Sequence, residues 1–276
     1  MALTDGGIAL NGLQVEDFTP IWLSGFELGA ESVETSDIEN SLYDTTRPGR
    51  DLYRGPTWTF EITVVGDTAA EVFDNEGLVR AAWRNQEDAK YAGSLSELEV
   101  NLAGRQRLVY GRPRRFASTA AQTAHQRYAI IDCDFKLMDP LIYDEAWKVL
   151  SFPLPASATE VSVTDEIEEV GGSAPTPFMV DVFANDGDIL NPQFTIDGNR
   201  YEFEMTIPAG EWLRVDTRRG FALLGTQNVI GRLRQRTRIR KVHLPANGPV
   251  DVLIGGADAT GTAEFKVWWR PAHYSI

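Results

Sequence analysis

Apolar and polar residues alternate along residues 57–66, and this is the clearest pattern in the chain. The apolar positions of this stretch are Trp58, Phe60, Ile62 and Val64. Threonines and one glutamate lie between them. Successive side chains of a β-strand point to opposite faces of a sheet, so the alternation predicts a strand with one buried face and one polar face.

Further strand-like segments flank this stretch in the first half of the chain. They are residues 10–15, 21–23, 106–111 and 127–137. Asn11-Gly12 and Pro20 interrupt the earliest of them, and residues 47–51 are rich in turn-forming types. We expect the residues before 57 to form a long hairpin arm.

One segment, residues 74–88, has helical spacing. Its apolar positions recur at intervals of three and four and are Leu78, Val79, Ala82 and Trp83. An Asp-Asn pair stands at its start and a glycine follows its end. The spacing therefore predicts one amphipathic helix that is capped by this Asp-Asn pair.

The second half of the chain consists of short strand-like segments separated by turn residues. The segments are residues 178–183, 193–196, 201–205, 212–216, 250–254 and 263–269. This pattern is typical of an antiparallel β-sandwich. Prolines and a Gly-Gly pair between residues 153 and 177 mark the entry to this half. We expect two domains, residues 1–150 and residues 151–276.

Composition and charge exclude several classes of protein. With 43 % hydrophobic residues among 276, the chain can build ordinary cores and is not expected to be disordered. The net charge of −14 argues against a general nucleic-acid binder, since such binding depends on Lys and Arg. No run of about 18 apolar residues predicts membrane insertion. The first residues lack the features of a secretion signal, so we expect synthesis and folding in the cytoplasm.

The residue types that most often carry catalysis or bind metals are few and scattered. The histidines, His125, His243 and His273, lie far apart, and Cys133 is the single cysteine. Zinc needs about four nitrogen, sulfur or oxygen ligands, and a nucleophilic cysteine needs a neighbouring base. No serine-hydrolase elbow, phosphate-binding loop or dinucleotide fingerprint occurs. The sequence therefore predicts no catalytic residue, metal site or cofactor, and a protein that is not an enzyme.

Two basic stretches stand out against the acidic background. The first contains Arg112, Arg114 and Arg115. The second, residues 232–241, has arginines at alternate positions, among them Arg234, Arg236 and Arg238. Alternate residues of a strand share a face, and like charges on one face repel unless carboxylates or a partner lie opposite. These six arginines are therefore candidates for contact with another subunit or with an acidic neighbouring strand.

Seven strings appear in a characteristic order along residues 8–145. They are Leu-Asn-Gly-Leu-Gln-Val at 10–15, Arg-Pro-Gly-Arg at 47–50, Thr-Trp-Thr-Phe-Glu-Ile at 57–62, and residues 78–84, 110–116, 132–135 and 139–144. In this order the chain resembles the minor tail proteins of long-tailed bacteriophages, and most closely the distal tail protein family. The second half fits that family's C-terminal domain by pattern only.

The resemblance implies a mainly β fold and a structural role in the virion. Residues 1–150 would form a tail-tube-like β-sandwich with one helix and a long hairpin arm. Residues 151–276 would form a galectin-like or carbohydrate-module-like antiparallel β-sandwich. Six copies would form a ring at the tail tip that lines the DNA channel, with DNA passing but not specifically bound. The implied partners are further copies of the chain, the tail tube protein, the tape-measure protein, and baseplate hub or receptor-binding proteins.

Two other function classes stay open. A carbohydrate-binding β-sandwich, acting as an adhesion module, would stack sugars on exposed aromatic rings, for which Trp212, Trp268 and Trp269 are candidates. Tryptophans in strands more commonly pack in a core. A glycoside hydrolase would need two carboxylates close together in space, and the sequence singles out no such pair among its 40 acidic residues. The tail protein ranks ahead of both.

Overall fold

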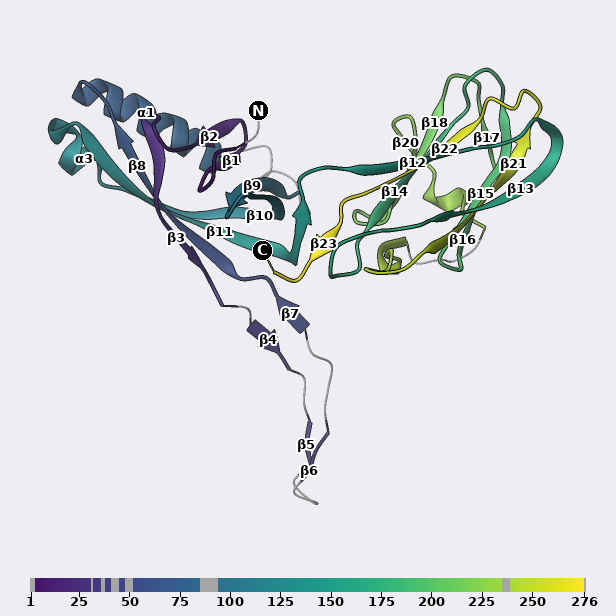
Figure 1. Cartoon of the computed structure of the whole chain (residues 1–276), viewed down its shortest axis with the longest axis horizontal. Coiled ribbons are helices and arrows are strands. Elements are labelled where there is room, and N and C mark those ends of the chain that lie inside the picture. Colours follow the sequence, from purple (N-terminus) through teal and green to yellow (C-terminus); the bar gives the residue numbers. More distant parts are fainter. Residues whose placement is uncertain are drawn as a thin grey trace. The chain divides into compact units, whose positions relative to one another are not determined.

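The computed structural model describes residues 3–30, 32–35, 38–40, 45–47, 52–84, 94–234 and 239–275. The chain divides into two compact units (Figure 1). Unit 1 comprises Met1–Glu145 and Tyr274–Ile276, and unit 2 comprises Ala146–His273. Each unit has a hydrophobic core of its own. Among the described residues, no helix combines the length and the apolar character that crossing a bilayer requires.

Unit 1 is built on an antiparallel sheet with the strand order β2-β1-β9-β10-β11-β8-β3. The strands are β1 (Ile8–Leu10), β2 (Leu13–Val15), β3 (Ile21–Leu28), β8 (Thr57–Val65), β9 (Ser96–Leu102), β10 (Arg105–Ser118) and β11 (Tyr128–Asp144). The two long strands β10 and β11 pair with each other, and β8 lies on the other side of β11.

The strand predicted from the alternating pattern is confirmed as β8. The four apolar side chains that the alternation placed on one face are all buried: Trp58, Phe60, Ile62 and Val64. They pack into the core of unit 1 together with side chains of β11, including Cys133 and Phe135. The period-2 pattern therefore predicted both the strand and the face that it buries.

The predicted helix exists but begins earlier than expected. Helix α1 spans Ala69–Trp83, and its N-cap is Thr68, whose hydroxyl accepts a hydrogen bond from the backbone N–H of Glu71. The Glu71 carboxylate in turn accepts from the backbone N–H of Asp67 at 2.7 Å. This Thr-x-x-Glu pattern is a capping box that starts the helix upstream of the Asp-Asn pair at 74–75, so the predicted start was wrong.

The buried face of α1 also differs in part from the prediction. Val79, Ala82 and Trp83 are buried as expected, together with Val72. Leu78, which the spacing placed on the packed face, is 56 % exposed. Predicted helical residues 85–88 lie outside the described residues. A second, short helix that the sequence did not indicate, α3 (Ala120–Thr123), is followed by the 3-10 turn η1 (Ala124–Gln126).

The predicted hairpin arm extends from β3 and β8 (Figure 1). In the arm, β4 (Ser32–Glu34) pairs with β7 (Leu52–Arg54), and β5 (Ile38–Asn40) pairs with β6 (Thr45–Arg47), both in antiparallel register. Most of the expected turn at 47–51 lies outside the described residues.

Unit 2 is an antiparallel β-sandwich, as predicted. One sheet has the order β12-β22-β14-β18-β19-β20, and the other has the order β13-β21-β15-β16 with β17 also paired to β15. The first sheet contains β12 (Lys148–Pro153), β14 (Phe178–Phe183), β18 (Trp212–Asp216), β19 (Phe221–Leu224), β20 (Gln227–Asn228) and β22 (Glu264–Trp269). The second contains β13 (Ser157–Ile167), β15 (Ile189–Ile196), β16 (Asn199–Glu202), β17 (Thr206–Ile207) and β21 (Val250–Asp258). Apolar side chains from both sheets form one core between them.

Two hairpins turn on residue pairs that adopt positive φ. Asn11 and Gly12 connect β1 to β2 with φ of 50° and 84°, and Asp197 and Gly198 connect β15 to β16 with φ of 48° and 73°. Two consecutive positive φ angles are those of the type I′ turn, which suits the twist of an antiparallel hairpin and favours Asn-Gly and Asp-Gly.

Candidate functional site

Within the described part of the chain, the residue types that most often carry catalysis or bind metals do not gather into a site. Among the residues that the structure describes, no group of three His, Cys, Asp or Glu side chains could hold a metal ion. Cys133 is fully buried in the core of unit 1. Burial, together with the charges of Asp132 and Asp134, raises the pKa of its thiol well above the usual range. The thiolate that a nucleophile requires is therefore strongly disfavoured.

The first basic stretch lies along β10, where one of its arginines is held and two are exposed. Arg112 is half-buried, and its Nε donates a hydrogen bond to the Ser94 carbonyl oxygen at 2.9 Å. Arg114 and Arg115 are exposed, and neither forms an ion pair with any described residue. The register of β10 against β11 shifts between Pro113 and Phe116, which is a β-bulge at this point. This part of β10 is therefore a basic, exposed rim, named here the rim of β10.

The described residues of the second basic stretch do not form the strand that its alternation predicted. Its described ends form 3-10 turns, η2 (Ile230–Arg232) and η3 (Ile239–Lys241). Arg234 forms ion pairs with Glu202 at 2.7 Å and with Glu204 at 3.4 Å. An acidic strand of the same unit therefore faces Arg234, which was one of the two predicted environments. Arg236 and Arg238 lie outside the described residues.

The three candidate tryptophans differ in their exposure. Trp269 is 2 % exposed in the core of unit 2, and its indole Nε1 donates to the Val170 carbonyl oxygen at 2.9 Å. Its ring has no open face for a sugar, so Trp269 was wrongly chosen as a stacking residue. Trp268, the residue before it in β22, lies on the other face of the strand and is half-buried. Trp212 is also half-buried, and the guanidinium of Arg214 lies 4.6 Å from its ring centroid.

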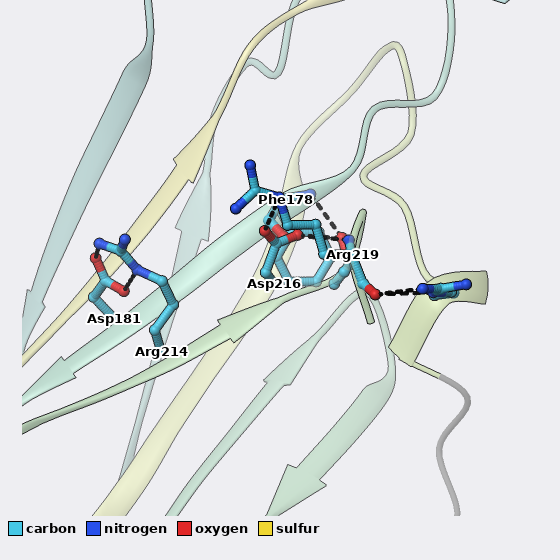
Figure 2. Close-up of polar contacts among 7 residues, drawn as sticks. Phe178, Asp181, Arg214, Asp216 and Arg219 are labelled. Atoms are coloured by element: carbon cyan, nitrogen blue, oxygen red, sulfur yellow. Dashed lines mark hydrogen bonds and ion pairs between the residues drawn. The ribbon is translucent and has the colours of Figure 1, made fainter. Parts of the chain in front are cut away.

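An ion pair lies on the outer face of the first sheet of unit 2 (Figure 2). Arg214 on β18 donates from Nε and Nη2 to the two oxygens of Asp181 on β14, at 2.7 and 2.8 Å. The Asp181 side chain is only 1 % exposed, whereas that of Arg214 is 36 % exposed. The hydrogen bond to Asp181 raises the pKa of Arg214 further above its already high value. The sequence offered no sign of this pair, because its members are 33 residues apart and meet only through strand register.

Aromatic and charged side chains surround this pair on the same sheet face. Lys266 lies 5.1 Å from the ring centroid of Phe183 and pairs with Glu264 at 3.0 Å. Phe183 is directly opposite Trp212 across the strands. Arg214 and Lys266 thus each lie against an aromatic ring and pair with a carboxylate. Because these charged groups already have partners, this face is a structural network and not a set of reactive groups.

Comparison with known proteins shows which solved structures share this fold. No protein-family model matches the chain, and no curated protein sequence matches it. Among solved structures, the chain is similar to the Dit protein of phage SPP1, described as a paradigm of the hub adsorption apparatus in phages that infect Gram-positive bacteria. That likeness has a TM-score of 0.60 at 11 % identity and covers 96 % of this chain and 98 % of that chain.

Two structures of the phage P2 baseplate in its activated conformation, one with Ca and one with Sr, are also similar. Their TM-scores are 0.55 and 0.54, each at 10 % identity over 92 % of this chain and 98 % of the baseplate chain. At such identities the likeness concerns the fold. The mainly β fold implied by the sequence resemblance is therefore confirmed, since solved phage Dit and baseplate proteins share it.

Proposed function

We propose that this chain is a structural protein of a phage tail tip that works by assembly and does not turn over a substrate. Six copies form a ring that joins the tail tube to the baseplate or receptor-binding proteins, with the tape-measure protein as a further neighbour. The observation that carries the proposal is that the likeness to the hub adsorption protein extends over nearly the whole of both chains. In the infected host, the protein would be made in the cytoplasm and end in the virion.

The hairpin arm supports an assembled state. A two-stranded hairpin alone is at best marginally stable in water, and the arm consists of two such pairs. At its base, Leu28 and Val33 are 50 % and 47 % exposed. The contact of a neighbouring subunit would cover these side chains and supply the packing that the arm lacks.

The polar face of the unit 1 sheet suits a channel for DNA. Glu61 on β8 lies directly opposite Asp132 on β11, and Asp134 follows on the same face. Carboxylates opposite one another disfavour any further anion nearby. A wall of this kind would let DNA pass without adhesion. The assembled protein should therefore show no DNA binding at physiological salt, and measurable binding under those conditions would contradict the channel role.

Electron microscopy of the purified full chain tests the proposal directly. Six-fold rings, with a matching mass by native mass spectrometry, are the expected result. A protein that remains monomeric alone and with the tail tube protein and baseplate proteins of the same phage would refute it.

A carbohydrate-binding module is the second candidate, because the half-buried Trp212 and Trp268 of unit 2 are partly open to solvent. A glycan array separates the two functions: saccharide binding that Trp212→Ala abolishes, in a protein that forms no ring, would favour the module.

A further inference from the structure

Phe18 is an exposed aromatic side chain in a strained backbone conformation. It lies in the loop between β2 and β3, is fully exposed to solvent, and has a φ of 65°. A bulky residue in the left-handed region is uncommon and costs on the order of 1–3 kcal/mol. Neither burial of the ring nor a preference of the residue for this conformation explains why phenylalanine stands here.

Hydrogen bonds within the loop hold Phe18 in this position. The Thr19 hydroxyl lies 2.8 Å from the Glu16 carbonyl oxygen and 2.6 Å from the Ile21 carbonyl oxygen, to which it can donate. The Glu16 backbone N–H also donates to the Ile21 carbonyl oxygen. The Glu16 carboxylate accepts from the Thr4 backbone N–H at 3.0 Å. The loop is therefore preorganised with the aromatic ring pointing outward, so little conformational entropy remains to be lost on binding.

The outward face of α1 carries large exposed apolar side chains beside the exposed acidic residues Glu71 and Asp74. Phe73 and Leu78 are 48 % and 56 % exposed, and a Cβ added at Gly77 would meet no atom within 4 Å. Ala70 and Ala81 are exposed as well. A surface helix normally turns its large apolar side chains away from solvent, so Phe73 and Leu78 have the character of side chains that a partner covers.

An acidic hollow joins the Phe18 loop to this helix. It has a volume of about 550 Å³ and is lined by Pro20, Val65, Gly66, Asp67, Glu71, Asp74 and Asn75. The carboxylates of Asp67 and Asp74 form no ion pair with any described residue. We name the whole patch the knob surface, comprising Phe18, Phe73, Leu78 and the hollow with its carboxylates.

The opposite charge lies at the rim of β10. Phe116 packs against the core and lies under the guanidinium of Arg80 on α1, with 4.8 Å to the ring centroid. Arg114 and Arg115 come just before it, within the register shift between β10 and β11, and both are exposed. One unit thus carries an acidic, apolar surface and a basic rim whose charged side chains form no ion pair with any described residue.

We propose that the knob surface of one copy receives Arg114 and Arg115 of the next copy, with Phe18 as the anchor. This inference rests on the proposed ring and names the surfaces that close it. Two different patches that complement each other in sign give a head-to-tail contact, which closes into a ring when the rotation permits. In protein interfaces, a few buried residues, often aromatic side chains and arginines, contribute most of the binding free energy. The proposed contact brings these residue types together.

The first test uses Phe18→Asn in the full chain, followed by native mass spectrometry and electron microscopy. Asparagine accepts the left-handed conformation readily, so the melting temperature should stay the same or rise. Self-association should nevertheless weaken by about tenfold or more, because the anchor is lost. Leu190→Ser, at a 47 % exposed position of unit 2, is the matched control and should leave the ring unchanged.

The second test exchanges charges. Asp67→Lys with Asp74→Lys, or Arg114→Glu with Arg115→Glu, should each dissociate the ring, and an equimolar mixture of the two double variants should form mixed contacts again. Glu168→Lys with Glu169→Lys in unit 2 is the control for net charge and should keep the ring.

The outcomes separate this inference from the proposed function. Rings that persist in the Phe18 variant and in both charge variants would overturn the knob contact and leave the tail-tip ring standing. A wild-type chain that forms no ring under any condition would overturn both.

Discussion

Asp181 and Arg214 lie directly opposite each other on β14 and β18 and share two hydrogen bonds across the strands. Because Asp181 is almost fully buried, its charge is acceptable only while the guanidinium neutralises it. The pair therefore fixes the register of the two central strands of this sheet as well as the charge balance of its outer face.

Arg214→Ala should destabilise unit 2 by about 2 kcal/mol, measured by urea unfolding. This is below the loss expected for a fully buried pair, because the guanidinium is partly exposed to solvent. Arg219→Ala is the matched control, since its contact with Asp216 is 3.9 Å long and its side chain is 71 % exposed. The control should change stability by no more than about 0.5 kcal/mol. Equal losses in the two variants would show that the buried carboxylate is not the cause.

Asp258 should make unit 2 less stable in acid. Burial opposes ionisation of this side chain, but hydrogen bonds from the Thr260 hydroxyl and from backbone N–H groups, including that of Ala263, outweigh it and hold its pKa below the usual value. A lowered pKa stabilises the folded state at pH values above the unfolded pKa of about 3.9, and this contribution is lost as the pH falls through the folded value.

The difference in unfolding free energy between the wild type and Asp258→Asn should therefore shrink between about pH 6 and about pH 3. Urea titrations at several pH values measure it. A difference that stays constant over this range would show that the carboxylate charge contributes nothing.

Thr68→Ala should cost about 1 kcal/mol, because the first turn of α1 loses the oxygen that accepts from the Glu71 N–H. Thr68→Ser keeps a hydroxyl and should retain most of the stability. Thermal unfolding of the two variants side by side provides the measurement, and an equal loss in both would indicate that the methyl group, not the cap, matters.

Cys133 should react with a thiol reagent only when unit 1 opens. It is fully buried, and its raised pKa leaves little thiolate. As the single cysteine of the chain, it gives an unambiguous signal. Labelling should be slow in buffer and accelerate with denaturant in step with unfolding. Labelling of the native protein at the rate of a free thiol would contradict the buried position.

The sequence predicted correctly the elements whose geometry is set by residues close together in the chain. The alternation around Phe60 and the Asn11-Gly12 turn were sufficient, because strand period and turn geometry involve only neighbouring residues. The same period distinguishes the buried Trp269 from the half-buried Trp268, although the sequence alone could not say which faced inward. The start of α1 was predicted wrongly, because the cap is formed by Thr68 and Glu71, upstream of the Asp-Asn pair at 74–75.

Features that arise from long-range register could not be predicted. Asp181 meets Arg214 only because β14 and β18 pair, and Glu202 meets Arg234 only because the chain folds back beside β16. The exposure of Phe18 likewise depends on the loop hydrogen bonds of Thr19, which no apolar pattern reveals. The knob surface therefore became visible only with the fold, whereas the sequence had already indicated Arg114 and Arg115 as contact candidates.

The sealed position of the lone sulfur has a consequence for the tail-tip role proposed above, in which the protein would be made inside a cell and used outside it. The chain has no disulfide for cellular reductants to cleave, and its single thiol is buried away from oxidants in the surrounding medium. Thiol redox chemistry should therefore leave the folded chain unchanged before and after release from a host.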